Sequence, residues 1–103
     1  MKTTINFNAA GVTFNKRQNL LAHLLSHPDA KITLWREPGN KHDPNAIKIL
    51  ANTGKRFQIG YVPRKLAETL APIMDKKTFV AIDAFKVVGN WKSNYGIQLQ
   101  ASY

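Results

Sequence analysis

Two pairs of residues have the types and spacing that catalysis or metal binding would need. His23 and His27 stand four residues apart, so one helix face could offer both rings to a metal, but Leu24 stands where a metalloprotease requires Glu. We therefore interpret the two as polar residues that flank an apolar face. His42 and Asp43 are adjacent, and an imidazole beside a carboxylate can act as an acid or base near neutral pH. A small nuclease that uses His42 stays open as an alternative.

The rest of the chain gives such an enzyme little material. The 6 Asp and Glu residues are scattered, whereas a two-metal nuclease needs clustered carboxylates. The glycines form no phosphate-cradling loop, and no Gly-x-Ser-x-Gly motif occurs. Cysteine is absent, which excludes disulfides, thiolate metal sites and cysteine nucleophiles. We expect a protein that performs no catalysis and needs no cofactor or metal.

The net charge indicates a polyanion as the partner. The chain has 15 Lys and Arg residues against 6 Asp and Glu, which gives a net charge of +9 and a pI of about 10.1. Such an imbalance destabilises a compact domain unless a polyanion compensates it, and it speeds association with nucleic acid. Charge that serves only solubility is the alternative explanation. A membrane surface fits less well, because no long basic amphipathic helix is evident.

The sequence shows no sign of export or membrane insertion. Its first residues lack the apolar run of a signal peptide, and no stretch approaches the roughly 18 apolar residues that a membrane span needs. Together with the absence of cysteine, this predicts a soluble, cytoplasmic protein. The length suits one domain, residues 1–103, without repeats or linkers, and we expect a monomer.

Hydrophobic patterns predict a mainly β chain. Alternating apolar residues indicate strands near 5–7 and 12–14, at 31–37, 46–50 and 56–62, and in a hairpin of 78–88 and 95–103 with 89–94 as its loop. Helical spacing indicates a helix over about 16–26, with Asn15 as its cap and Gln18 in a capping box. A second helix starts at Pro63 and should be kinked or ended by Pro72. About six short strands and two short helices predict a small barrel or curled sheet with the helices as plugs.

Basic, aromatic and turn residues are interleaved in four segments, at 13–17, 39–45, 60–65 and 90–95. A base stacked on an aromatic ring gains about 1–3 kcal/mol, and a neighbouring Lys or Arg can pair with a phosphate, so this interleaving is typical of proteins that bind unpaired strands. A protein that reads a duplex would need a long element to fill a groove. For Phe14, Tyr61 and Trp91, the alternative is that the ring only packs in the core.

Three stretches of the sequence carry a resemblance to a known family. They are Gly11-Val12-Thr13-Phe14, the block Leu34-Trp35-Arg36-Glu37-Pro38-x-Asn40-x-x-Asp43-Pro44-Asn45-Ala46-Ile47-Lys48-Ile49, and Ile59-Gly60-Tyr61-Val62-Pro63-Arg64-Lys65-Leu66-Ala67. In this order they resemble the HIRAN domain, which occurs fused to SNF2-type helicases and as free-standing bacterial proteins. The resemblance spans nearly the whole chain, and its central block is quite specific. It implies a modified OB-like, six-stranded β-barrel with two short helices that recognises single-stranded DNA, in particular a free 3′ end.

The resemblance also implies roles for individual residues. Phe14 matches the position whose ring stacks on the terminal base, and Tyr95 matches a second aromatic residue near that base. Tyr61 and Arg64 match positions that hold the backbone phosphate. In the first turn of the second helix, Arg64 would add its charge to a helix N-terminus that already suits anions.

A loop carries the remaining roles. Asn40, His42 and Asp43 match the family's loop that closes over the terminal nucleotide. A carboxylate can accept a hydrogen bond from a 3′-hydroxyl but would repel a 3′-phosphate, so Asp43 would sense the end of the strand. Asp-Pro-Asn is also a good turn and capping sequence, so a purely structural Asp43 stays open.

The chain departs from the family pattern at two places. Lys41 and His42 stand where the family usually has Pro and an aromatic residue, which would make binding depend on the charge of His42 and so on pH. Thr13 stands where some relatives carry Arg, which removes one phosphate contact. Nearby cations that could replace it are Lys16, Arg17, Lys41 and Lys92.

Our leading hypothesis is a non-catalytic module that captures the 3′ end of single-stranded DNA, with a helicase or nuclease as a further partner. Stacking does not distinguish sugars, so an RNA-binding barrel is one alternative. A protein-interaction module is another, namely an adaptor or inhibitor whose basic face docks on an acidic helicase or nuclease.

Overall fold

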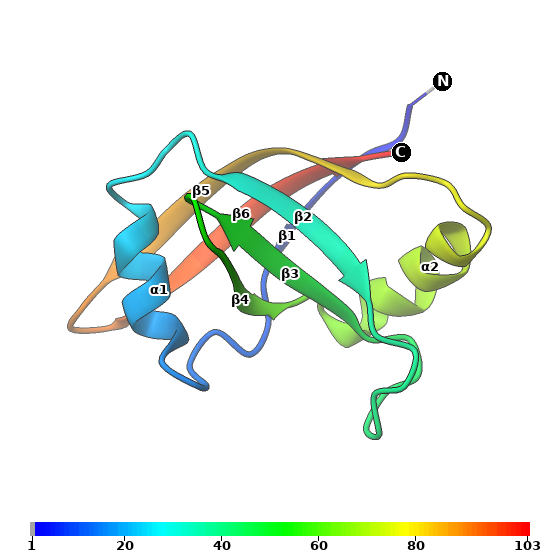
Figure 1. Cartoon of the computed structure of the whole chain (residues 1–103), viewed down its shortest axis with the longest axis horizontal. Coiled ribbons are helices and arrows are strands. Elements are labelled where there is room, and N and C mark those ends of the chain that lie inside the picture. The colour runs from blue at the N-terminus through cyan, green and yellow to red at the C-terminus, as the bar shows by residue number, and fades with distance from the viewer. Residues whose placement is uncertain (1) are drawn as a thin grey trace.

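The computed structural model in Figure 1 describes residues 2–103 as two antiparallel three-stranded sheets and two helices. In the first sheet, β6 (Asn94–Ser102) lies between β1 (Thr4–Asn8) and β5 (Ala81–Asn90). In the second sheet, β3 (Ile47–Asn52) lies between β2 (Lys31–Arg36) and β4 (Arg56–Tyr61). The helices are α1 (Arg17–Leu24) and α2 (Arg64–Asp75). The prediction of a mainly β chain is confirmed.

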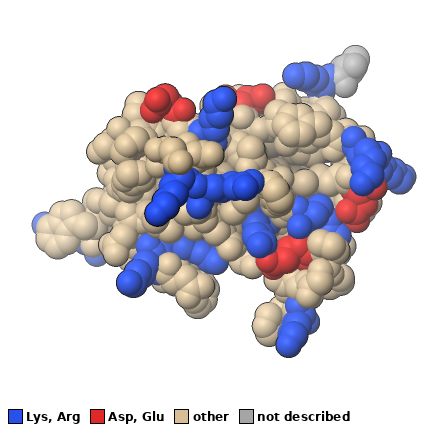
Figure 2. Space-filling model, viewed as in Figure 1, with Lys and Arg blue, Asp and Glu red and all other residues tan. Residues whose placement is uncertain are grey.

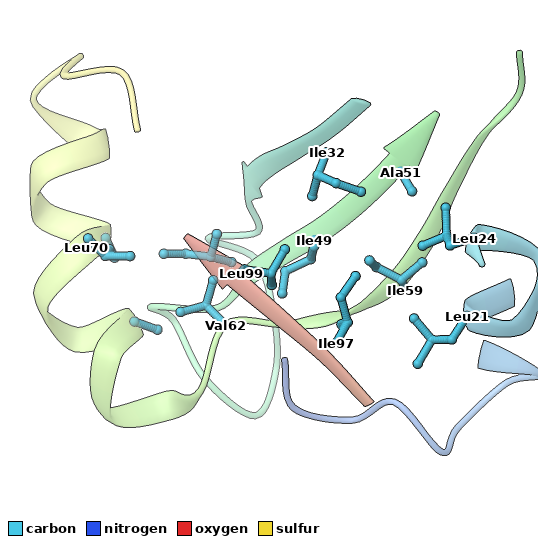
Figure 3. Close-up of a cluster of buried hydrophobic side chains, with 13 residues drawn as sticks. Leu21, Leu24, Ile32, Ile49, Ala51, Ile59, Val62, Leu70, Ile97 and Leu99 are labelled. Carbon is cyan, nitrogen blue, oxygen red and sulfur yellow. The ribbon is translucent and has the colours of Figure 1, made fainter. Parts of the chain in front are cut away.

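The core lies between the sheets, and each helix covers one of its ends. Buried residues of β3 alternate with more exposed neighbours, because successive side chains of a strand point to opposite faces. Figure 3 shows Leu70 of α2 at one end of the cluster and Leu21 and Leu24 of α1 at the other. Between them pack aliphatic side chains from the strands and their flanks, which include Ile32, Ile47, Ile49, Ala51, Ile59, Val62, Ile97 and Leu99. The helices therefore act as plugs.

The two sheets are joined at one corner. There Ala10, just beyond β1, forms an antiparallel bridge with Tyr61 at the end of β4, through backbone hydrogen bonds of 2.8 and 2.9 Å. At the other edges, β2 and β5 do not pair within the described residues, and a hollow between them is lined by 28–33 and 82–85. Lys31 and Asp83 border this hollow. The predicted OB-like fold of six strands and two helices is thus confirmed, although the sheets do not close into a full barrel.

The segment before α1 differs from the prediction. Residues 12–16 form turns rather than a strand, and both Asn15 and Lys16 have left-handed backbones, with φ of 53° and 63°. Asn15 therefore does not cap the helix, which begins at Arg17 without a side-chain cap and ends at Leu24. Gln18 is not part of a capping box, because its side chain makes tertiary hydrogen bonds that are described below.

The C-terminal hairpin is confirmed, with a tighter connection than predicted. β5 and β6 pair up to Asn90 and Asn94, which leaves residues 91–93 as the loop. The side chain of Asn90 accepts hydrogen bonds from the backbone N–H groups of Lys92 and Ser93, at 2.9 and 3.0 Å. In α2, Pro72 lies inside the helix, which continues to Asp75.

Gly60 is required where the sheets meet. A Cβ at this position would lie 2.6 Å from the carbonyl oxygen of Ala10, which is closer than real contacts allow. We expect Gly60→Ala to disrupt the bridge and to lower the free energy of unfolding by about 1–3 kcal/mol, the usual range for overpacking. Gly39→Ala is the matched control, since nothing lies within 4 Å of its added Cβ. Urea denaturation compares the variants, and equal stabilities would contradict this account of the corner.

Candidate nucleic-acid interface

An open pocket of about 310 Å³ lies beside the corner at which the two sheets meet. It is bordered by the end of β4, the start of α2 and the long loop between β2 and β3. Its lining residues are Ala10, Asn40, His42, Asp43, Ala46, Tyr61, Val62 and Arg64. The structure therefore brings together five of the residues that the sequence singled out: Asn40, His42, Asp43, Tyr61 and Arg64.

Asn40 fixes the shape of the loop. Its side-chain oxygen accepts hydrogen bonds from the backbone N–H groups of His42 and Asp43, at 2.8 and 3.0 Å. Its side-chain nitrogen donates to Oε1 of Glu37 at 2.5 Å. Both ends of this amide are thus engaged within the protein, and Asn40 positions its neighbours in the pocket.

Glu37, at the end of β2, connects the loop to the second sheet. Oε1 also accepts a hydrogen bond from the Tyr61 hydroxyl at 3.0 Å, and Oε2 pairs with Nζ of Lys48 at 3.1 Å. The hydrogen bond from Asn40 lowers the pKa of Glu37, burial opposes this shift, and the contacts with Lys48 and Tyr61 lower the pKa further. Glu37 is therefore held ionised at the base of the loop.

Asp43 has one oxygen in a structural role and one that faces the pocket's basic residue. Oδ1 accepts a hydrogen bond from the backbone N–H of Asn45 at 2.9 Å, so the predicted turn role is present. Oδ2 lies 3.9 Å from Nε of Arg64, which is a loose ion pair. The Asp43 side chain is 18% exposed, whereas that of Arg64 is 74% exposed. The guanidinium can therefore reach a ligand while the carboxylate stays in place.

Tyr61 is held at its hydroxyl and at its ring. The hydroxyl donates a hydrogen bond to Glu37, and the guanidinium of Arg17 lies 5.5 Å from the ring centroid. Arg17 is only 7% exposed, and its Nη1 donates to the carbonyl oxygen of Gly11 at 2.7 Å. The expectation that Arg17 is a free loop cation is therefore wrong. Its proximity to Tyr61 spans 44 positions of the sequence (61 − 17), and no local pattern indicates it.

Phe14 lies at the rim of this arrangement. Its ring is 64% exposed, so it does not pack in the core. A Cβ at Gly11 would lie 3.8 Å from the Phe14 ring and 3.9 Å from the Tyr61 ring, which shows that both rings approach the same glycine. Lys16 is exposed in the same turn, and Lys41 is exposed in the loop beside His42.

Gln18 anchors the turn of Phe14 to β6. Its side-chain nitrogen donates to the carbonyl oxygens of Val12 and Tyr95, at 3.0 and 2.9 Å. Its side-chain oxygen accepts from the backbone N–H of Tyr95 at 2.6 Å. The start of β6 is thereby fixed against the turn, while the Tyr95 ring packs partly against the core.

Lys92, like Tyr95 of β6, does not line the pocket. It lies at the tip of the β5–β6 hairpin, at the left in Figure 1, whereas the loop between β2 and β3 hangs from the lower right of the molecule. Figure 2 shows Lys and Arg side chains spread widely over the same face, with few acidic side chains among them.

The residues considered for catalysis or metal binding are engaged otherwise. The rings of His23 and His27 lie 4.1 Å apart, but His27 Nδ1 bonds to the backbone oxygen of His23 and His23 Nε2 bonds to Thr53. Within residues 2–103, no group of three or more His, Asp or Glu side chains could hold a metal ion. The carboxylate of Asp43 contacts Asn45 and Arg64 rather than the His42 ring.

The fold and the pocket together define a small β-domain with an open pocket bordered by aromatic and basic side chains. The sequence model of the HIRAN domain matches residues 2–101, and the chain belongs to this family. The predicted family is thereby confirmed. HIRAN domains occur in proteins that process nucleic acids, and membership supports a DNA-binding module.

The chain is similar to short segments of much larger proteins. It is 50% identical over 48 residues to the Fanconi-associated nuclease 1 homolog of Oryza sativa subsp. japonica, a match that covers 46% of this chain and 5% of that protein. It is 48% identical over 46 residues to the helicase-like transcription factor of Oryctolagus cuniculus, covering 45% of this chain and 4% of the relative. The matched segments therefore make up a small fraction of these relatives.

A solved structure shares the fold over the whole domain. The crystal structure of a protein from Lactobacillus plantarum superimposes with a TM-score of 0.70 and covers 99% of this chain and 98% of its own. The two are 22% identical.

Neither helix in the described part of the present chain is long and apolar enough to cross a membrane.

The pKa of Glu37 predicts how the loop responds to acid. Because it lies below the ordinary value of 4.5, the stability that ionised Glu37 contributes is complete above pH 4.5 and is lost as the pH falls through the lower, folded value. We expect Glu37→Gln to be less stable than the wild type at neutral pH, and this difference to shrink between about pH 5 and pH 3. Urea denaturation across this range measures it. A difference that does not change with pH would show that the charge of Glu37 is unimportant.

Proposed function

We propose that this HIRAN domain binds single-stranded DNA and recognises its 3′-hydroxyl end in the pocket between the β2–β3 loop and α2. The observation that carries the proposal is the convergence of Asp43, Tyr61 and Arg64 on one pocket. The exposed ring of Phe14 approaches the same glycine, Gly11, as the Tyr61 ring does. The net charge of +9 favours a polyanionic ligand. The names of its relatives, a nuclease homolog and a helicase-like transcription factor, agree with a nucleic-acid ligand.

Stacking and phosphate binding come from different sides of the pocket. Phe14 presents an exposed ring on which the terminal base stacks, and such a stack contributes about 1–3 kcal/mol. Arg64 is the first residue of α2, whose first turn contains no acidic residue. The free N–H groups of a helix N-terminus attract anions, so Arg64 and this turn together bind the last internucleotide phosphate. Lys16, just before α1, and Lys41, in the β2–β3 loop, are exposed and add positive charge.

Asp43 distinguishes the end of the strand. The hydrogen bonds from Asn40 to the loop and the bond of Oδ1 to Asn45 leave Oδ2 in a fixed position at the pocket. Oδ2 accepts the hydrogen bond of a 3′-hydroxyl, whereas a 3′-phosphate would bring negative charge against the carboxylate. His42, exposed in the same loop, packs beside the terminal nucleotide.

End recognition is tested with one short DNA strand that carries either a 3′-hydroxyl or a 3′-phosphate. Because a hydrogen bond to a charged group contributes about 1.5–3 kcal/mol, we expect the hydroxyl strand to bind the wild type at least about tenfold more tightly. Fluorescence anisotropy with a 5′-labelled strand measures both affinities. Equal affinities would refute end recognition, even if the strand binds.

The matched variant is Asp43→Asn rather than Asp43→Ala. An Asn side chain keeps an oxygen for the N–H of Asn45, so the loop retains its turn, but it removes the negative charge. We expect this variant to bind the phosphate strand more tightly than the wild type does, and to lose most of the discrimination between the 3′-hydroxyl and the 3′-phosphate.

Binding of the matched RNA strand, measured by competition with the DNA strand, decides whether the sugar matters.

The salt dependence of binding reports the phosphates that are contacted. If about three phosphates are neutralised, the logarithm of the affinity falls with the logarithm of the salt concentration at a slope near −2, since each phosphate of a single strand contributes about 0.7. Arg64→Gln should make this slope less negative by about 0.7. Lys31→Gln, on the hollow between β2 and β5, is the control and should leave the slope unchanged. A slope near zero for the wild type would contradict phosphate binding.

A further inference from the structure

The tip of the β5–β6 hairpin presents an aromatic ring and a cation together. The Trp91 ring is 76% exposed, and Nζ of Lys92 lies 5.3 Å from its centroid. The two hydrogen bonds from the backbone to Asn90 fold the tip into a defined turn. The ring offers a surface on which a base can stack, and the neighbouring ammonium can pair with a phosphate.

Hydrogen bonds join the start of β6 to the segment before α1, and that segment also approaches Tyr61 at the pocket. Gln18 joins the start of β6 at Tyr95 to the turn at Val12, and the neighbouring Gly11 is approached by the rings of both Phe14 and Tyr61. From left to right, Figure 1 shows the hairpin tip, the turn before α1 and the β2–β3 loop along the lower side of the molecule. One extended strand could follow this side from the pocket to the tip.

The distribution of acidic residues favours a path from the pocket to the hairpin over a path across α2. Residues 2–28 and 84–103, which form β1, the turn, α1, β6 and the part of β5 after Asp83, contain no Asp or Glu. They contribute the cations Lys16, Lys86 and Lys92. A path over α2 would instead meet Glu68 and Asp75. A phosphate backbone that leaves the pocket toward the hairpin therefore meets only positive charge.

We propose that Trp91 and Lys92 form a second stacking site for the same DNA strand, which takes a nucleotide on the 5′ side of those in the pocket. This inference rests on the proposed function, because the 3′ end in the pocket sets the direction of the strand. The strand then runs with its 5′ part at the hairpin tip and its 3′ part at the β2–β3 loop. Short strands occupy only the pocket, and longer strands reach both sites.

The dependence of affinity on strand length tests this site. Thymidine strands of about two to about twelve nucleotides, all with a 3′-hydroxyl, are titrated against the wild type and Trp91→Ala, because single-strand binders cover about 4–16 nucleotides. We expect the two proteins to bind the shortest strands equally, and Trp91→Ala to bind the longest strands roughly 5- to 150-fold more weakly. Lys92→Gln should make the salt slope less negative by about 0.7 for long strands only.

Phe79→Ala is the matched control. Phe79 is 77% exposed, as much as Trp91, but it lies between α2 and β5, at the other end of the molecule in Figure 1. Its removal should not change the affinity at any length. A loss of equal size for Trp91→Ala at every length, no loss at any length, or the same loss in Phe79→Ala would each overturn the second site.

Tryptophan fluorescence gives a direct second measurement. The chain contains two tryptophans, so Trp35→Phe leaves Trp91 as the sole tryptophan. Long strands should quench its emission and the shortest strands should not. If long strands bind without quenching, the second site is wrong, while preference for the 3′-hydroxyl in the same protein would leave the pocket's function intact. If that preference is absent, the proposed function itself fails.

Discussion

The carboxylate of Glu37 is the interaction on which the pocket depends. It stands at the end of β2 and binds the side chains of Asn40, Lys48 and Tyr61, so that a loop and two strands converge on one charged group. Without it, Asn40 would lose the contact that orients its amide. The loop backbone would then lose the side-chain oxygen that accepts hydrogen bonds from the N–H groups of His42 and Asp43. The position of Asp43 follows from this arrangement, because its N–H is held by Asn40. The residue that shapes the site is thus not among those that would touch the ligand.

The sequence predicted the elements whose pattern is local. Alternating apolar residues located the strands of both sheets, and Pro63 marked the start of α2. The family resemblance singled out the loop from Asn40 to Asp43 and the end of β4, and these residues do share a pocket.

The sequence failed where contacts between distant residues decide the structure. Gln18 has the right spacing for a capping box, but the backbone of Tyr95, 77 residues away, offers it better partners. Arginine is a residue type that usually lies on the surface, yet Arg17 is buried against Tyr61 and Gly11. Closure of the barrel depends on whether β2 and β5 pair, which no property of either strand alone determines.

The joining of the sheets at Ala10 and Tyr61 has a mechanical consequence. Two plates connected along one edge pivot about that edge, and points near the pivot move least when the plates swing apart. The hollow between β2 and β5 lies at the free margin, whereas the pocket lies beside the connection. Any relative motion of the sheets is therefore expected to be largest at the margin between β2 and β5 and smallest near Tyr61, Asp43 and Arg64.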